Sequence, residues 1–405
     1  MSDRSRVSVS GPLAEFAVGF AERLAGLGYS PRGAEGQLRL MKYLSVSLAA
    51  QGLSAGDLTG AVVGRFVAGR RARHVSFRSE RALVPLLTFL RELGVVPVAL
   101  AVTPTDPVDV LLERFAQYLS TQRGLAPATV ASYVSQVRPF LAWHDGLRDP
   151  RWESLTAAQV DRFVVARAVG QRPRSVQVGL TAVRALARWM CLEAITPPGL
   201  ADMIGSVAGW TATTPPKALT LGQIDDLLTG LSADPVARCR DEAILAMMWR
   251  MGLRAGEVAS LRLDDIDWRT GVVVVHGKGD RSEQVPLPVD VGELLVAYLQ
   301  RARPMGVDHR QVFLAIDAPH HRLGAAAVSS VATRAAARGN VPPPCAAHRL
   351  RHTAACQVLA RGGGLVEAGQ LLRHATAAAT AVYTRCDLAA LSVLARPWPV
   401  PAVTS

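Results

Sequence analysis

Apolar residues recur with helical spacing along most of this 405-residue chain, and one short stretch breaks that pattern. Residues 271–276 and 282–287 are rich in β-branched side chains and flank Gly277-Lys278-Gly279-Asp280, which is typical of a β-hairpin. A chain of many amphipathic helices and one hairpin must bury most of its apolar surface by packing helix against helix. We therefore predict a mainly α-helical protein with a small β-sheet, in which helical units precede a mixed α+β domain.

The helical pattern divides into two units before the hairpin region. Proline-containing stretches at residues 101–107 and 211–217 predict linkers, so we expect three domains, at residues 1–103, 104–213 and 214–405. The helices expected in the first two domains cover residues 13–27, 34–50, 62–69 and 79–94, then 108–123, 127–144, 156–169 and 173–194.

The two N-terminal units share a plan that suggests an internal duplication. Pro31 matches Pro127 at a separation of 96 positions, and several further matches occur at 97. Chance similarity between two amphipathic units is the alternative. The matches at 97 are Tyr43 with Phe140, Leu58-Thr59 with Leu155-Thr156, and Arg65-Phe66-Val67 with Arg162-Phe163-Val164.

A formal charge of +12 and a pI of about 10.2 favour a polyanionic partner, either nucleic acid or an acidic membrane surface. The basic residues are spread over all three units and are not gathered on one amphipathic helix, which disfavours the membrane. With no long apolar run and no signal peptide, we expect a cytoplasmic protein. The five cysteines form no CxxC pair, so we predict reduced, mostly buried thiols and no metal site.

Two cations in the third unit suggest phosphate chemistry. Arg254 lies in a glycine-flanked turn before a predicted helix, where a guanidinium and helix amides can face a phosphate. Lys278 lies at the predicted hairpin tip, and a lysine, unlike an arginine, can give up a proton. Each is also compatible with an ordinary surface residue, but only three lysines occur in the chain, which favours a role for Lys278.

Further titratable groups follow at helical spacing. His348 and Arg351 are three positions apart and share one helical face, whereas we expect His352 to face elsewhere and to serve packing. His374 precedes Tyr383 by nine positions. Taken singly, such a histidine and a tyrosine in an alanine-rich helix are ordinary packing residues.

The ordered set resembles the tyrosine recombinase, or phage integrase, family over about residues 217–385. The supporting positions Glu257, Asp264-Asp265-Ile266-Asp267 and Thr380 resemble it too, and residues 108–200 look like the family's DNA-clamping core-binding domain. The resemblance implies a site-specific recombinase acting on double-stranded DNA without a cofactor. Its implied site is Arg254, Lys278, His348, Arg351, His374 and Tyr383.

By this resemblance, Tyr383 forms a 3′-phosphotyrosyl bond, Arg254 and Arg351 hold the phosphate, and Lys278 protonates the leaving 5′-oxygen. His348 and His374 assist proton transfer or position the phosphate, in interchangeable roles. Two departures stand out: Arg373 replaces a common glycine, and Arg349 replaces a common acidic residue.

The resemblance also implies four protomers on two DNA sites, and a helical tail at residues 387–395 could dock on a neighbour or on its own domain. Two alternatives remain open, a type IB topoisomerase and a DNA-binding regulator without activity. The extra first unit favours the recombinase of a mobile element, with an additional DNA-contacting role for that unit.

Overall fold

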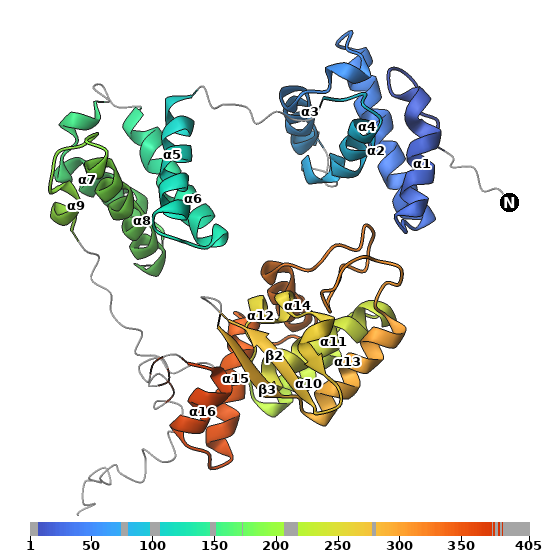
Figure 1. The fold of residues 1–405 in the computed structure, drawn as a ribbon, viewed down its shortest axis with the longest axis vertical. Helices are drawn as coiled ribbons and strands as arrows, with labels where there is room; N and C mark the ends of the chain where they lie inside the picture. Colours follow the sequence, from blue (N-terminus) through green and yellow to red (C-terminus); the bar gives the residue numbers. More distant parts are fainter. Residues whose placement is uncertain are drawn as a thin grey trace, which may run out of the picture. The chain divides into compact units, whose positions relative to one another are not determined.

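The computed structural model describes residues 7–73, 80–97, 106–145, 151–171, 173–205, 218–277 and 281–374, with the single residues 376, 380 and 383. The N-terminal part is an all-helical unit (Figure 1). Ser30 accepts a hydrogen bond from the Gly33 amide and Pro31 occupies the first turn of α2, two features that start a helix. Its elements are η1 (Ala14–Phe16), α1 (Ala17–Gly26), α2 (Pro31–Ala49), η2 (Ala55–Asp57), α3 (Gly60–Arg73), η3 (Glu80–Leu83) and α4 (Val84–Glu92).

The first unit has its own apolar core. Phe20 and Leu24 of α1, Met41 and Leu44 of α2, and Leu90 of α4 are fully buried within it. The predicted helices are confirmed, although α4 begins later than expected, because a 3-10 turn precedes Pro85.

Residues 106–205 form a second helical unit with a separate core. Asp106 caps α5, and Thr156 with Gln159 forms a capping box that starts α7. Phe115 and Trp189 pack in the core with ring centroids 5.4 Å apart. The elements are α5 (Pro107–Thr121), α6 (Pro127–Asp145), η4 (Trp152–Ser154), α7 (Ala157–Ala168), α8 (Pro173–Leu192) and the unpredicted short helix α9 (Leu200–Met203).

The C-terminal part combines helices with one small antiparallel sheet of order β1-β2-β3. Val273 and Val275 turn one face of the sheet into the core, and β2 pairs with β3 from Val272↔Pro286 to His276↔Ser282. The predicted hairpin and the mixed α+β composition are therefore confirmed, while the two-residue strand β1 was not predicted. The elements are α10 (Leu221–Thr229), α11 (Pro235–Arg250), α12 (Ala255–Ser260), η5 (Leu263–Asp265), β1 (Ile266–Asp267), β2 (Val272–His276), β3 (Ser282–Pro286), α13 (Val289–Arg301), α14 (Ala325–Arg338), α15 (Ala347–Ala360) and α16 (Leu365–Leu372).

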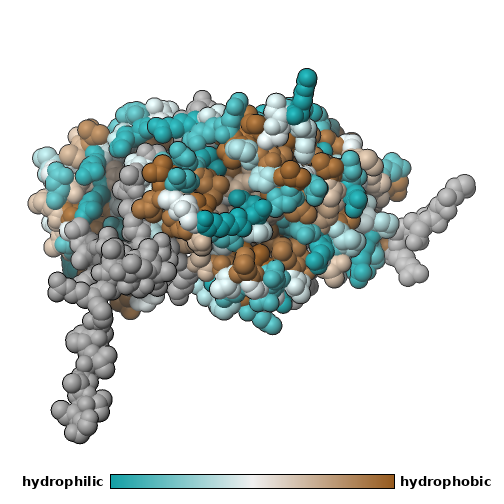
Figure 2. All heavy atoms as spheres, turned by 90° about the horizontal axis from the view of Figure 1, so that it is seen from below, coloured by the Kyte–Doolittle hydropathy of each residue, from teal (hydrophilic) through white to brown (hydrophobic). Residues whose placement is uncertain are grey.

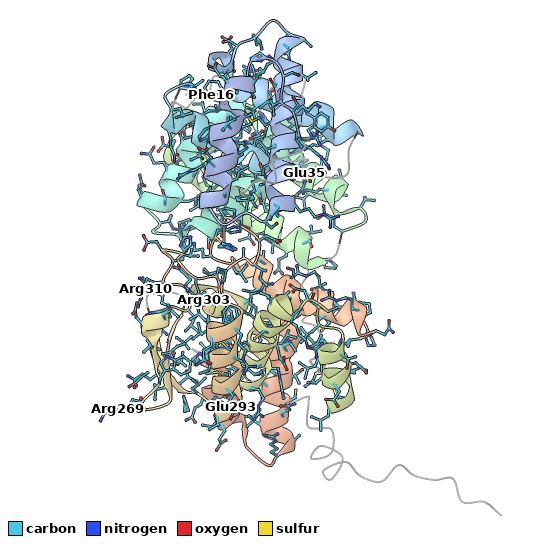
Figure 3. The ribbon with its side chains drawn as sticks, turned by 90° about the vertical axis from the view of Figure 1, so that its right-hand side faces the viewer. Phe16, Glu35, Arg269, Glu293, Arg303 and Arg310 are labelled. Carbon is cyan, nitrogen blue, oxygen red and sulfur yellow. The ribbon has the colours of Figure 1, made fainter. Side chains whose placement is uncertain are left out.

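Ion pairs and carbonyl contacts hold the loop between α13 and α14. Arg303 donates to the carbonyl groups of His309, Gln311 and Val312, and Arg310 pairs with Asp264 beside the sheet. Figure 3 shows Arg303 and Arg310 on the same side of this part, and Arg269 at the turn that leads into β2 points outward. These contacts fix the loop that follows α13 next to the sheet.

Packing contacts divide the chain into two compact units, one of residues 99–213 and one of residues 1–98 with residues 214–405. The described residues nevertheless contain three large separate cores, one for each predicted domain. The three-domain division stays a prediction, and most of both predicted linkers lies outside the described residues.

The cysteine prediction was only partly right. Cys345 is buried, whereas Cys191, Cys239 and Cys356 are partly accessible, because each lies on a helix at the border between its core and solvent. Cys386 lies outside the described residues.

Within the described ranges, every helix is too short or too polar to cross a membrane. Figure 2 shows hydrophilic and apolar side chains interspersed over the face in view.

Candidate active site

Arg254 stands at the start of α12, as predicted. Its backbone N–H donates to Glu257 Oε2 at 2.8 Å, and its Nη1 donates to Glu257 Oε1 at 2.6 Å. The Arg254 side chain is 48% exposed, whereas that of Glu257 is 5% exposed. A buried carboxylate thus orients a guanidinium that still faces solvent and can receive an anion.

Glu257 also binds a second arginine. Arg373 Nη2 donates to Glu257 Oε2 at 2.7 Å, and Arg373 Nη1 donates to the Leu371 carbonyl oxygen at 3.1 Å. Arg373 caps the end of α16 with φ +52° and ψ +53°, the left-handed conformation that favours glycine. The backbone explains why glycine suits this position, and the buried ion pair offsets the strain that arginine incurs there.

Arg351 is buried on α15 and holds two carbonyl groups. Its Nη1 donates to the Gly252 oxygen and its Nη2 to the Leu372 oxygen, which joins α15 to the turn before α12 and to the end of α16. His348 is exposed on the same helix, and its ring meets that of His352 edge-on with centroids 4.2 Å apart. Arg351 therefore stands behind the site surface, and His348 stands on it.

Tyr383 lies against two histidines, one on α15 and one just after the end of α16. Its hydroxyl is 2.6 Å from His352 Nδ1, and its ring stacks at 6.1 Å on His374, which follows α16. His374 Nδ1 lies 2.8 Å from the Thr380 hydroxyl. The Tyr383 residue is only 2% exposed, so this structure holds the hydroxyl away from solvent.

Tyr298, the other tyrosine of the C-terminal part, is a core residue. Its hydroxyl accepts a hydrogen bond from the Leu314 amide at 3.2 Å, and its ring stacks on Phe313. Burial is the main reason why its pKa is raised above the ordinary tyrosine value. Tyr383, with its histidine contacts, is the better candidate nucleophile.

A cleft of about 1170 Å³ lies between the β2–β3 hairpin, α12 and α16. Lys278 lies outside the described residues, but its neighbours Gly277 and Arg281 line this cleft. The hairpin and Arg254 therefore line the same cleft. The lining residues are Arg254, Gly256, Glu257, Val275, His276, Gly277, Arg281, Glu283, Leu365, Val366, Gly369, Gln370, Arg373, His374, Thr376 and Thr380.

The hairpin base is fixed by side-chain hydrogen bonds. His276 Nε2 lies 3.0 Å from Asp265 Oδ1, and His276 Nδ1 lies 2.9 Å from the Ser282 hydroxyl. The bonds link the last residue of β2 to the first of β3 and to the turn before β1, so they hold the base of the hairpin against that turn.

The histidines of the site are held neutral. Burial, then the charge of nearby groups, lowers the pKa of His352 and that of His374 to about 4, and the same causes lower the pKa of His348. A neutral imidazole nitrogen can accept a proton from a tyrosine hydroxyl. The lowered pKa values keep these nitrogens unprotonated at neutral pH, so they are free to accept a hydrogen bond or a proton, although each is a weaker base than an ordinary histidine.

The arginine and carboxylate groups stay charged. Burial and the neighbouring Arg254 lower the pKa of Arg351 to about 10, which still leaves it protonated at neutral pH. Burial alone would raise the pKa of Glu257, but the Arg254 amide and the charges of Arg373 and Arg254 lower it overall. The site thus carries a surplus of positive charge in a low-dielectric setting, which suits a phosphate.

Five of the six predicted residues, all except Lys278, converge in one region of the structure. The expectation that His352 faces elsewhere was wrong, because four positions along a helix bring it back beside His348 and over Tyr383. That spacing was visible in the sequence. Arg349, by contrast, donates to the Pro342 carbonyl oxygen and to Gln223, a contact that ties α15 to the proline run and α10.

No cluster of three or more histidine, cysteine, aspartate or glutamate side chains that could hold a metal ion occurs in the part of the chain that the structure describes.

Two family models match this chain in the predicted order. The model "Phage integrase, N-terminal SAM-like domain" matches residues 112–194, and the model "Phage integrase family" matches residues 217–389. The second match spans the cleft and every residue of the predicted site.

Curated relatives extend the similarity to nearly the whole chain. A protein named as an integrase/recombinase, y4rA of Sinorhizobium fredii, is 33% identical over 96% of this chain and 95% of its own length. Tyrosine recombinase XerD of Listeria monocytogenes is 28% identical over 68% of this chain and 93% of its own.

Solved structures share the fold at low identity. XerH recombinase bound to a palindromic difH substrate in a post-cleavage complex matches with a TM-score of 0.58 and 16% identity, over 72% of this chain and 97% of that one. A lambda integrase dimer bound to a COC′ core site matches with a TM-score of 0.54 and 16% identity, over 73% of this chain and 99% of that one.

Proposed function

Since the chain belongs to the phage integrase, or tyrosine recombinase, family and cleaves and rejoins DNA site-specifically, we propose that Tyr383 is its nucleophile. The observation that carries this proposal is the convergence of Tyr383 with His352, His374 and Arg351 behind the cleft that Arg254 lines.

The arginines neutralise the scissile phosphate. A phosphodiester resists attack because its charge repels nucleophiles and its leaving alkoxide is poor, so the catalyst must offset charge and supply a proton. Arg254 is accessible and already oriented by Glu257. To bind DNA, Arg351 must exchange its hydrogen bond with the Gly252 or Leu372 carbonyl oxygen for one with a phosphate oxygen. This exchange suits the buried Arg351 guanidinium, because a phosphate compensates its positive charge better than a neutral carbonyl group does.

Cleavage exchanges one phosphoester for another. Tyr383 Oη forms a bond to phosphorus, the bond to the 5′-oxygen breaks, and the 5′-hydroxyl leaves with a proton from Lys278 on the hairpin loop. The phosphoryl group stays on the 3′ end as a phosphotyrosine. Since ester bonds are conserved, a 5′-hydroxyl can reverse the step and reseal either partner strand without nucleotide hydrolysis.

The Tyr383 proton passes to a histidine. His352 is hydrogen-bonded to the hydroxyl in this structure, and His374 stacks beside it with its Nδ1 engaged by Thr380. We assign His352 as the hydrogen-bond partner that holds the hydroxyl while Tyr383 is buried, and His374 or His348, which face the bound phosphate, as the acceptor of the Tyr383 proton during attack. Tyr383 must become exposed before it reaches DNA, because its hydroxyl is now enclosed.

The partner is double-stranded DNA, with four protomers on two sites during strand exchange. The DNA-bound XerH structure supports DNA as the partner, and the lambda integrase dimer on a core site supports two protomers on one DNA site, so that two such dimers would make the proposed four. The proposed setting is a mobile element, which is consistent with y4rA, a relative that also covers the extra N-terminal unit.

Covalent trapping tests the assignment. Wild type and Tyr383→Phe are incubated in EDTA with nicked duplexes cut from the DNA that flanks the gene, and denaturing gels reveal an adduct. We expect an adduct with wild type only, and Tyr298→Phe serves as a matched control that keeps it. Specific binding without an adduct would favour a regulator, whereas relaxation of supercoils without strand exchange would favour a topoisomerase.

A further inference from the structure

We propose that residues 7–97 are a second copy of the unit at residues 106–205 and that this copy binds double-stranded DNA. The inference rests on the proposed function for its choice of partner. The family models match the second unit and the catalytic part, and neither covers residues 7–97.

Both units have four main helices in the same order, with a 3-10 turn between the second and the third. The helices α2 and α6 each start with a proline in the first turn and each have 19 residues. A 3-10 turn follows in both, and the third helix begins directly after Thr59 in one unit and Thr156 in the other. Helix order alone is common among small bundles, so a test of register is needed.

Nine pairs of buried residues occupy equivalent positions in the two units. Equivalent positions in the two units differ in residue number by 95 in the first helix, by 96 in the second, by 97 from the 3-10 turn through the third helix, and by 100 in the fourth. The difference therefore changes only between elements. Two unrelated bundles would have no reason to bury the same positions in all four helices at these separations. The buried pairs are Phe20 with Phe115, Leu24 with Leu119, Met41 with Val137, Leu44 with Phe140, Leu48 with His144, Leu58 with Leu155, Val63 with Val160, Leu86 with Leu186 and Leu90 with Met190.

This register corrects one match made from sequence. Tyr43 is 49% exposed while Phe140 is 2% exposed, so the two are not equivalent, and Leu44 takes the place of Phe140. The extra position enters between the second helix and the 3-10 turn, where a loop can absorb it.

The fourth helix ends in the same hydrogen-bonded cap in both units. The Leu90 carbonyl oxygen accepts from the Val95 and Val96 amides at 3.0 and 3.3 Å, after Gly94 at φ +71°. In the second unit, the Met190 carbonyl oxygen accepts from the Ile195 and Thr196 amides at 2.8 and 3.4 Å, after Ala194 at φ +55°.

The same aromatic pair joins the first and fourth helices. Phe20 and Phe89 lie 5.5 Å apart at 38°, and Phe115 and Trp189 lie 5.4 Å apart at 43°. Register, cap and aromatic pair are independent features, and together they support a duplicated fold over two unrelated bundles.

The charge of the copy fits a polyanion. Residues 7–97 carry eleven lysine and arginine residues against six carboxylates, whereas residues 106–205 carry eleven against nine. Arg65 and Arg162, 97 positions apart, are both exposed on the third helix. The excess of basic over acidic residues is therefore larger in residues 7–97 than in residues 106–205, which favours contact with DNA phosphates.

Photocrosslinking of the full chain tests the proposal directly. Tyr383→Phe protein is bound to bromodeoxyuridine-substituted duplexes from the DNA that flanks the gene, irradiated and digested, and the DNA-linked peptides are identified. We expect linked peptides from residues 7–97 as well as from residues 106–205. Links confined to residues 106–205 and the catalytic part would overturn the inference and leave the proposed function intact.

Charge reversal provides a second, quantitative readout. Arg65→Glu and its equivalent Arg162→Glu should each weaken DNA binding about tenfold at 0.1 M salt and lower the slope of log affinity against log salt by about 1. Arg269→Glu, a matched change of an exposed residue in the β1–β2 turn, should leave the slope unchanged.

The two proposals fail in different ways. If Arg65→Glu leaves DNA affinity and slope unchanged while the wild type still forms its tyrosine adduct, the DNA-binding role of the copy is wrong. The choice of DNA is also wrong if Arg65→Glu weakens binding to phosphatidylserine vesicles only. Absence of the adduct would instead count against the proposed function.

Discussion

Arg373 gives a sharp test of how the site is held together, because its backbone and its side chain act in opposite directions. In the left-handed conformation a non-glycine residue costs about 1 kcal/mol or more. The buried ion pair with Glu257 works the other way, and breaking a buried pair costs roughly 3–5 kcal/mol. Glu257 keeps the Arg254 amide and guanidinium as partners, so we take the lower end of that range.

Two substitutions separate these contributions. Arg373→Ala removes the ion pair and keeps the strain, so the end of α16 should lose about 3 kcal/mol. Arg373→Gly removes both, so the loss should be about 2 kcal/mol. The glycine variant should therefore be more stable than the alanine variant, although glycine usually destabilises structured backbone.

Amide hydrogen exchange of the α16 peptide is the suitable assay, because it reports this element alone in a chain with several cores. At 1.36 kcal/mol for each tenfold, we expect exchange to be faster by about 30-fold in Arg373→Gly and about 150-fold in Arg373→Ala. Equal exchange in the two variants would refute the argument from backbone strain. Exchange as slow as in wild type would refute the stabilising role of the ion pair.

Three further predictions concern protons and the nucleophile. The C-terminal part should lose stability as the pH falls from about 6.5 to about 4, because the pKa values of His352 and His374 are lowered in the folded chain and the unfolded chain therefore binds more protons in that window. Thermal unfolding of wild type and His352→Gln across this pH range checks it, and a stability that rises on acidification would contradict it. Lys278→Ala should slow cleavage by roughly 10²–10⁴-fold while DNA binding is retained. A substrate with sulfur in the 5′-bridging position should recover most of the rate, because a thiolate leaves without a proton. An equal defect on both substrates would show that Lys278 is not the acid. His352→Ala should increase the labelling of Tyr383 by tetranitromethane several-fold in DNA-free protein, and the buried Tyr298 is the internal control. Unchanged labelling of Tyr383 would mean that its hydrogen bond with His352 does not hold it in place.

Local sequence signals predicted the elements well because they are local in origin. Thr156 and Thr220 cap helices through their side chains, and α7 and α10 begin directly after them. The valine-rich run at residues 272–275 became the central strand for the same reason. The start of α2 was predicted three residues too late, because Pro31 occupies its first turn instead of ending the turn before it. The strand β1 was missed because two residues carry no pattern, and only pairing with β2 defines it.

The site was predictable as a set of residue types but not as a set of contacts. The spacing of His348 and Arg351 placed them correctly on one helix, yet the bonds of Arg351 to two distant carbonyl groups depend on how three elements pack. The contact of His352 with Tyr383 spans 31 positions and arises only in the folded chain. The ion pair between Arg373 and Glu257 spans 116 positions, and no local signal predicts it.

The enclosure of Tyr383 has a consequence for the safety of the genome that hosts this enzyme. A minor state that costs a few kcal/mol is populated at roughly 0.1–10%, so only that fraction of free protomers would present the hydroxyl at any moment. If strand exchange requires two protomers to present it together, independent openings would coincide in only roughly one in 10² to one in 10⁶ cases. A solitary protomer that meets an arbitrary sequence would thus cut it roughly 10- to 1000-fold more slowly than a protomer held open, and the free energy of assembly on the correct pair of sites would supply what opening costs.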